Sequence, residues 1–351
     1  MLFSQLACRW LFTTVQILTL AGVVSLTSLI TVSNAVPLTL ARIEANVDWT
    51  SAGISGVGGG EGSIELTGVT GRVVQAFLYW HGIDVIANGG DGVYDNATVM
   101  VNGSPVNGVS LGDATTNCWG EGSSRAFRAD VSAVVGGDGT YLITGLTANP
   151  GHSANGVSLI VIFDDGDDSN NRDVVFFEGN DSNVPDNFPG EDEGWNATLS
   201  DIEYRGGVVQ AQLHVADGQS FADADLTFSS SAGTVTIPDS PFLYDGNSVD
   251  SAGTSRAIDG ELWDIHNLEI TPAFGSPGTR TLNMSGLVDS GDCLSLVLAL
   301  LDLEPGSAPP AGPGIAFDPP ALDFGDSGVS TCSELLTVTV SNVGSGGLDL
   351  G

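Results

Sequence analysis

Residues 208–215 read Val-Val-Gln-Ala-Gln-Leu-His-Val, an alternation of apolar and polar side chains. A period of two places the apolar side chains on one face of a β-strand and the polar ones on the other. Runs at 73–80 and 294–303 are more continuously apolar, which favours central positions in a sheet. Similar short runs bounded by Gly, Asn and Asp recur between residues 63 and 303. The sequence therefore predicts an all-β fold of β-sandwich (jelly-roll or Ig-like) units, with one short helix at 129–135.

The charge balance excludes whole classes of partner. The 351 residues include 43 Asp and Glu against nine Lys and Arg, all nine being Arg, and the formal net charge is -34. Nucleic acid and anionic membrane surfaces both require a cationic protein surface. An apolar content of 42% is still enough to bury a core, so the chain is not an acidic disordered segment.

The first 35 residues predict a secretory signal peptide. Arg9 precedes a run without charge at 11–32, and the small residues Ser33 and Ala35 suit a signal peptidase. A retained membrane anchor is the alternative, because about 20 apolar residues span a bilayer. No other segment predicts a membrane span. We expect a secreted or cell-surface location.

Cysteine usage agrees with an exterior compartment, where disulfides persist. Without the signal segment the chain keeps Cys118, Cys293 and Cys332. Cys118 and Cys293 both lie where a loop meets a strand-like segment, and we predict a bridge between them. The four His lie far apart at 81, 152, 214 and 266, and their spacing does not form a zinc motif.

Composition changes divide the chain. A polar stretch at 180–194 separates a first sandwich unit (36–190) from a second (191–304). Residues 305–313 are rich in Pro and predict a stiff linker. A further segment occupies 314–351.

This last segment carries a family resemblance. Residues 315–325 read Ile-Ala-Phe-Asp-Pro-Pro-Ala-Leu-Asp-Phe-Gly, and 336–344 read Leu-Thr-Val-Thr-Val-Ser-Asn-Val-Gly. The order resembles the opening strands of the Hydin-type (ASH) immunoglobulin-like module of bacterial choice-of-anchor D surface proteins. Such a module needs about 100 residues, so the resemblance implies an incomplete module and a fragment of a longer protein. The order of the segments at 76–80, 97–103, 156–163 and 172–177 resembles the β-sandwich that begins many bacterial cell-surface proteins, over about residues 45–305. This resemblance implies display outside the cell and no catalytic motif.

The most acidic segment offers the oxygen ligands that Ca²⁺ prefers. It contains Asp164, Asp165, Asp167, Asp168 and Asp173 between two strand-like runs. An EF-hand is disfavoured because strands flank the loop and a needed Gly is missing. Two interpretations stay open, a calcium site between strands and a solvated acidic hairpin, and the hairpin is favoured. Apart from calcium we expect no cofactor.

Aromatic and His residues suggest further roles. Trp119 and Trp195 lie in Gly-rich loops, where an exposed ring could stack on a sugar, whereas Trp80 belongs to an apolar strand and is expected in the core. For His81 and His214 we expect capping or surface positions.

The sequence as a whole favours a non-catalytic secreted or cell-surface protein with a structural or adhesive role. Its partner would be an exterior protein or polysaccharide. Extracellular polysaccharide binding is the first alternative, and a secreted hydrolase is the second. The hydrolase would require a cleft holding paired carboxylates, or a Ser and a His in contact.

Overall fold

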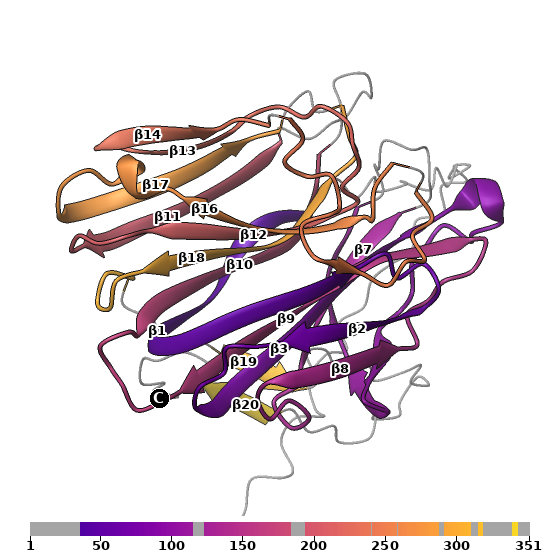
Figure 1. Ribbon diagram of the computed structural model, residues 1–351. Coiled ribbons are helices and arrows are strands. Elements are labelled where there is room, and N and C mark those ends of the chain that lie inside the picture. Colours follow the sequence, from indigo (N-terminus) through magenta and orange to yellow (C-terminus); the bar gives the residue numbers. More distant parts are fainter. Residues whose placement is uncertain are drawn as a thin grey trace, which may run out of the picture. The chain divides into compact units, whose positions relative to one another are not determined.

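The computed structural model describes residues 36–114, 123–183, 194–239, 241–257, 259–287 and 291–309, and the backbone of two strands at 315–318 and 339–342. These residues form twenty strands and two single-turn 3-10 helices, so the all-β prediction is confirmed (Figure 1). The helix expected at 129–135 is wrong, because the chain there completes a strand and then turns. The signal segment, the boundary near residue 190 and most of the C-terminal segment lie outside the described residues. Within the described part, no helix has the length and apolar character needed to span a membrane.

A long sheet runs in the order β16-β12-β18-β10-β1-β9-β3-β7-β6, with β15 pairing separately to β1. Its strands come from both sides of residue 190. They are β1 (Val36–Ser55), β3 (Arg72–Asp84), β6 (Val109–Ala114), β7 (Ser124–Asp130), β9 (His152–Asp164), β10 (Arg172–Ser182), β12 (Gln210–Ala216), β15 (Asp250–Ser251), β16 (Trp263–Glu269) and β18 (Ser295–Leu303).

Strand β1 joins the two halves of this sheet. Its residues 36–47 pair with β10, and its residues 48–55 pair with β9. The change of partner coincides with a register shift between Glu44 and Val47 and with a positive φ of 56° at Asn46. A bulge of this kind bends a strand and increases its twist. Strand β1 therefore belongs to two halves of the sheet. One half contains β16, β12, β18 and β10, and the other contains β9, β3, β7 and β6.

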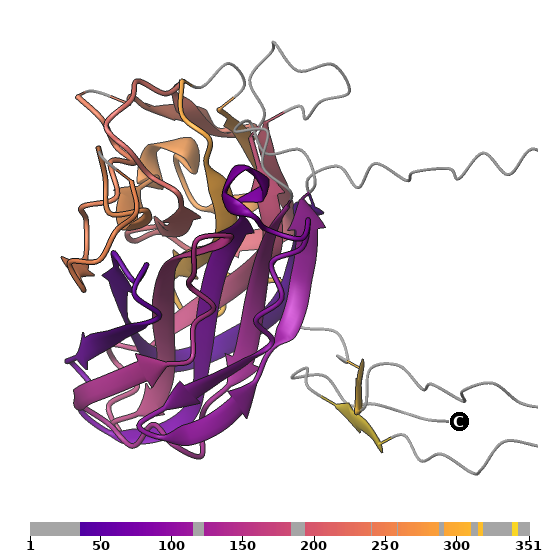
Figure 2. The same ribbon diagram turned by 90° about the vertical axis from the view of Figure 1, so that its right-hand side faces the viewer.

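Two small sheets complete the architecture. One has the order β2-β8-β4-β5 and the other β11-β17-β13-β14. Their strands are β2 (Glu61–Leu66), β4 (Thr98–Val101), β5 (Ser104–Asn107), β8 (Gly139–Thr144), β11 (Trp195–Tyr204), β13 (Leu226–Ser230), β14 (Gly233–Ile237) and β17 (Gly278–Gly286). The 3-10 turns are η1 (Ile86–Asn88) and η2 (Thr271–Ala273), and a separate antiparallel pair, yellow in Figure 2, consists of β19 (Ile315–Asp318) and β20 (Thr339–Asn342).

Three apolar clusters hold these sheets together. One lies between the β11-β17-β13-β14 sheet and strands β10, β12 and β18, and it includes Leu213 and Phe228. A second lies between the β2-β8-β4-β5 sheet and strands β1, β3, β7 and β9, and it includes Trp80, whose predicted core position is confirmed. The third joins the two halves of the long sheet through residues such as Phe77 and Trp263. Both faces of the long sheet are therefore buried over much of their area.

Two glycines permit close contacts between the halves. A Cβ on Gly156 in β9 would lie 2.3 Å from Trp263 Cβ in β16, and one on Gly53 in β1 would lie 2.7 Å from Ile265 Cδ1. Trp263 is fully buried. Because strands β9 and β16 belong to opposite halves, the absence of a side chain at Gly156 permits their contact.

We predict that Gly156→Ala destabilises the fold by about 2 kcal/mol, because the added methyl overpacks a buried contact with the Trp263 ring. Urea unfolding of the full chain measures the effect. Gly136→Ala is the matched control, since a Cβ there meets nothing within 4 Å. Equal stability of the two variants would contradict the close packing of the halves.

Candidate functional site: the Trp49 groove

The acidic segment, for which an acidic hairpin and a calcium site were the two interpretations, forms the turn between β9 and β10. Asp164, Asp165 and Asp167 each accept a hydrogen bond through Oδ1 from the amide two residues ahead, at 3.1, 2.8 and 3.0 Å. Short Asp side chains favour turns in this way. The amide of Asp167 is the largest cause that holds the pKa of Asp165 below its usual value.

The other two predicted ligands also accept hydrogen bonds. Asp168 Oδ1 lies 3.4 Å from Asn171 Nδ2. Asp173 is buried, and its two oxygens accept from the amides of Asn46 and Ala308, each at 3.0 Å. These hydrogen bonds give the acidic side chains structural roles: they stabilise the turn and bind neighbouring backbone amides. Calcium binding by this loop stays an untested alternative to the solvated hairpin.

Another group has the composition of a metal site. Among the described residues, Asp84, Asp91 and His152 place one ligand atom each within 4.8 Å of one another. Sequence spacing did not indicate this group, because its members come from a strand end, a loop and the start of a distant strand.

Only one cysteine of the predicted disulfide, Cys293, lies among the described residues. Cys293 is disulfide-bonded and nearly buried. Cys8, Cys118 and Cys332 lie outside the described residues, so the pairing of Cys118 with Cys293 stays a prediction.

The expectation of an exposed ring at Trp195 is wrong. Trp195 begins β11, is 0% exposed, and makes an edge contact with the Tyr244 ring at 5.5 Å. Packing of the small sheet on the apolar core buries the Trp195 ring in spite of the Gly-rich sequence around it. The ring therefore has no exposed face on which a sugar could stack. Trp119, the other predicted sugar-binding residue, lies outside the described residues.

The expected surface positions of His81 and His214 are also wrong. Both are fully buried. Burial lowers the pKa of His81 to about 4 and that of His214 to about 3, so both rings are neutral at pH 7.

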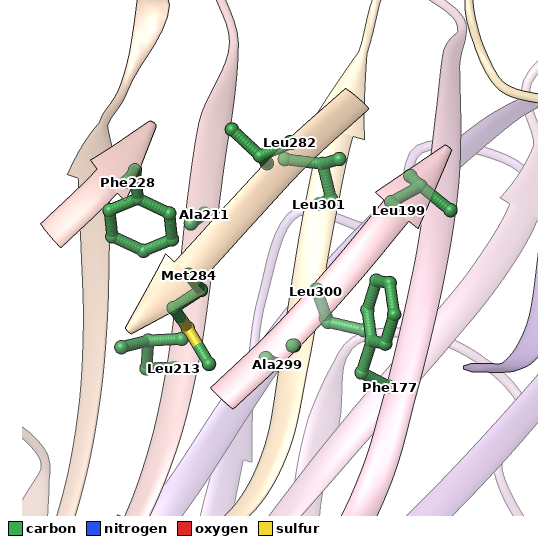
Figure 3. Close-up of a pocket in the computed structure, with 11 residues that line it drawn as sticks. Phe177, Leu199, Ala211, Leu213, Phe228, Leu282, Met284, Ala299, Leu300 and Leu301 are labelled. Carbon is green, nitrogen blue, oxygen red and sulfur yellow. The ribbon is translucent and has the colours of Figure 1, made fainter. Parts of the chain in front are cut away.

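The apolar cavity in Figure 3 is a packing gap. It has about 30 Å³ and is lined by apolar side chains, among them Phe228, Leu282 and Met284 from the small sheet and Leu213 and Leu301 from the long one. This volume is about that of one water molecule, and an apolar lining offers water no hydrogen bonds. The cavity is not a ligand site.

A polar groove offers far more room. It has about 550 Å³, within the usual range for ligand sites. We call it the Trp49 groove. It is lined by Asp48, Trp49, Thr50, Ser51, Gly68, Thr70, Phe163, Asn170, Arg172, Gln212, Asn267 and Asp302, which come from both halves of the long sheet and from the loops beside them.

One wall of the groove is held by charge-assisted contacts. Trp49 Nε1 donates to Asp302 Oδ2 at 3.1 Å, and Arg172 Nε donates to Asp302 Oδ1. Arg172 also pairs with Glu304 at 2.5 Å and donates to the Val208 carbonyl. Burial raises the pKa of Asp302, and the Arg172 guanidinium opposes that shift. The half-buried indole of Trp49 is thereby fixed at the groove.

Two further lining residues, Gln212 and Asn267, are held by a chain of hydrogen bonds from the core. Trp263 Nε1 donates to Ser158 Oγ at 2.9 Å, and Ser158 Oγ lies 2.8 Å from His214 Nδ1. His214 Nε2 lies 2.8 Å from Gln212 Oε1, which only accepts, so Nε2 carries the proton and the Ser158 hydroxyl donates to Nδ1. Gln212 Nε2 then donates to Asn267 Oδ1 at 2.8 Å. The two amides are therefore oriented before any ligand arrives.

Alternation in 208–215 did indicate that Gln212 lies on a polar strand face. Its proximity to Trp49 and Asp302 follows from the packing of the two sheet halves, for which the sequence carries no local signal.

We predict that Asp302→Ala lowers the free energy of unfolding by about 3 kcal/mol, because it removes the acceptor of Trp49 and leaves the half-buried Arg172 poorly paired. Glu304→Gln is the control, since Glu304 is more exposed and its pair with Arg172 is worth less than about 1 kcal/mol. Chemical denaturation compares them. Equal losses of unfolding free energy in the two variants would contradict a larger contribution of Asp302 to stability.

We also predict a pH effect of His214. An unfolded His titrates near 6.5, whereas folded His214 has a pKa of about 3. The unfolded chain therefore binds a proton that the folded chain does not, and stability present above pH 6.5 is lost as the pH falls. In His214→Gln the slope of unfolding free energy against pH, between pH 5.5 and 4, should decrease by about 1.4 kcal/mol per unit.

Asp292 changes the unfolding free energy with pH in the opposite direction, so His214→Gln must be compared with the wild type. Burial raises its pKa to about 6, so the folded chain holds a proton there that the unfolded chain releases. This term is common to wild type and variant and cancels in the difference of slopes. Equal slopes would show that His214 does not stay neutral in the fold.

Comparisons with known proteins do not supply a relative. No family model matches the chain, and no curated protein or solved structure matches it either. Function is therefore inferred from the chemistry of the groove.

Proposed function

We propose that this chain is a non-catalytic exterior protein with a structural or adhesive role, and that it binds polysaccharide in the Trp49 groove. The observation that carries the proposal is one half-buried indole beside prearranged amide, carboxylate and guanidinium groups. A sugar ring has an apolar C–H face and hydroxyls that both donate and accept. An aromatic ring suits the face, and planar polar side chains suit the hydroxyls.

Prearrangement supports affinity. Trp49, Asp302 and Arg172 hold one another, and Gln212 holds Asn267. Side chains that are already ordered lose little conformational entropy when a ligand binds. A groove about 550 Å³ in volume accommodates a short stretch of a sugar chain.

The charge of the protein selects among polysaccharides. A net charge of -34 repels polyanions such as uronate or sulfated chains. We therefore propose a neutral or amino-sugar polymer as the ligand.

The exterior location is supported by the disulfide at Cys293, because such bonds persist in oxidising compartments. The pair β19–β20 joins two of the segments that resemble the ASH module. Display on a bacterial surface, with this module following the sandwich, is part of the proposal.

The hydrolase alternative has less support. Ser158 and His214 are in contact at 2.8 Å, but both are fully buried and Ser158 Oγ already accepts from Trp263. Asp302, the acid at the groove wall, is bound to Arg172 and Trp49.

The test is calorimetric titration of the full chain with soluble neutral oligosaccharides, including β-glucan, xylan, mannan and chitin fragments. We expect saturable binding of at least one, loss of more than about tenfold in affinity in Trp49→Ala, and a severalfold loss in Asn267→Ala. Asn247→Ala is the matched control, because Asn247 is an exposed Asn outside the groove.

Absence of binding across the panel, or equal binding by Asn267→Ala and Asn247→Ala, would contradict the proposal. Release of reducing ends during the titration would assign the chain to the hydrolases instead.

A further inference from the structure

The group of Asp84, Asp91 and His152 arises from strand register. Asp84 ends β3 and His152 begins β9, and the antiparallel pairing places these two residues opposite each other. Asp91 lies in the loop that follows η1. Three residues from separate parts of the sequence thus meet at one end of the strand pair.

Three oxygen acceptors surround His152 Nε2. His152 Nε2 lies 3.4 Å from Asp84 Oδ2, 3.6 Å from Asp91 Oδ1 and 3.3 Å from the Val93 carbonyl. His152 Nδ1 lies 3.1 Å from Asn149 Oδ1, and an amide oxygen only accepts, so Nδ1 carries the proton of the neutral ring. The lone pair of Nε2 then faces three oxygens. A proton or a metal cation between Nε2 and these oxygens would relieve this contact of lone pairs.

Asp84 lacks the usual compensation for burial. It is 0% exposed, and neither of its carboxylate oxygens accepts a hydrogen bond from the described residues. An ionised carboxylate in this position is costly unless it is paired or coordinates a metal.

A second Asp–His pair in the molecule shows the contrast. His266 Nε2 lies 3.5 Å from Asp264 Oδ1, and Asp264 is equally buried. However, Asp264 accepts from the amides of Gly246 at 2.7 Å and Ser248 at 3.2 Å. Backbone donors satisfy that carboxylate, whereas Asp84 has its oxygens left for another partner.

The loop is shaped to cover Asp84. A Cβ on Gly90 would lie 2.3 Å from Asp84 Oδ2, so a side chain at this position would occupy the space beside the carboxylate. The amide of Gly90 donates to the Val85 carbonyl, which holds the loop in place. The Gly89-Gly90 pair therefore permits a close approach to a buried acid.

We propose that Asp84, Asp91 and His152 bind a divalent transition-metal ion of the Zn²⁺ class. A tetrahedral ion with bonds of about 2.1 Å has ligand-to-ligand edges of about 3.4 Å. The separations of His152 Nε2 from Asp84 Oδ2 and Asp91 Oδ1, 3.4 and 3.6 Å, are close to this value. One imidazole and two carboxylates suit Zn²⁺ better than Ca²⁺ or Mg²⁺, which take oxygen ligands. Asn149 orients the ring as a hydrogen-bond acceptor behind the ligand. The side chain of Asp91 is 79% exposed, which leaves an entry path.

Metal binding would connect the loop after η1 to the start of β9. Because the ion binds the folded chain, it raises stability by mass action.

The experiment is calorimetric titration of Zn²⁺ into the full chain, previously stripped with chelator, at neutral pH with excess Ca²⁺ present to occupy diffuse acidic sites. We expect one saturable equivalent and a higher melting temperature with Zn²⁺. Asp91→Asn keeps the acceptor for the Val93 amide and alters an exposed side chain, so folding should be preserved. Affinity should fall by more than about tenfold in Asp91→Asn and in His152→Gln.

Two matched controls should bind Zn²⁺ as the wild type does. Asp95→Asn changes a neighbouring carboxylate of the same 79% exposure, and His266→Gln changes the other Asp–His pair. The absence of a saturable equivalent in the wild type would overturn the proposal and assign the positive charge to a protonated His152. Unchanged affinity in Asp91→Asn and His152→Gln, or an equal loss in the controls, would overturn it as well.

Discussion

The packing of the two halves of the long sheet against each other is the constraint on which the rest of the structure depends. Strand β1 changes partner at Asn46 and so belongs to both halves. Gly156 lets β9 approach Trp263 in β16, and the third apolar cluster fills the space between the halves. Because both faces of the sheet are covered, polar side chains on the inner face must find partners within the protein.

Several of these polar side chains bind one another in the interior. Ser158 and His214 link Trp263 to Gln212, and Gln212 reaches the Trp49 groove. Satisfied buried networks rigidify a structure, whereas an unsatisfied group is costly. Asp84 is such a group at one end of the β3–β9 pair, and it lies beside His152 and Asp91 in the site that we propose for a metal ion. The groove and the metal group are thus separate sites with separate tests.

Local sequence was informative where burial follows from alternation. In 208–215 the apolar positions Val209, Ala211, Leu213 and Val215 all lie in one core cluster. His214 was expected at the surface but is buried, because alternation distinguishes two strand faces without saying what covers the second one. Trp195 shows the same error, since a Gly-rich neighbourhood does not reveal that the ring packs in a core between two sheets.

The sequence by itself determined the all-β class, the apolar strand faces and the acidic β9–β10 turn, because these depend on neighbouring residues along one strand or turn. The tertiary structure alone decided that Trp49 contacts Asp302 and that Asp84 lies beside His152. These contacts join residues 253 and 68 positions apart. They depend on strand register and on the packing of two sheet halves, and one residue of slip in register would move every side chain to the other face.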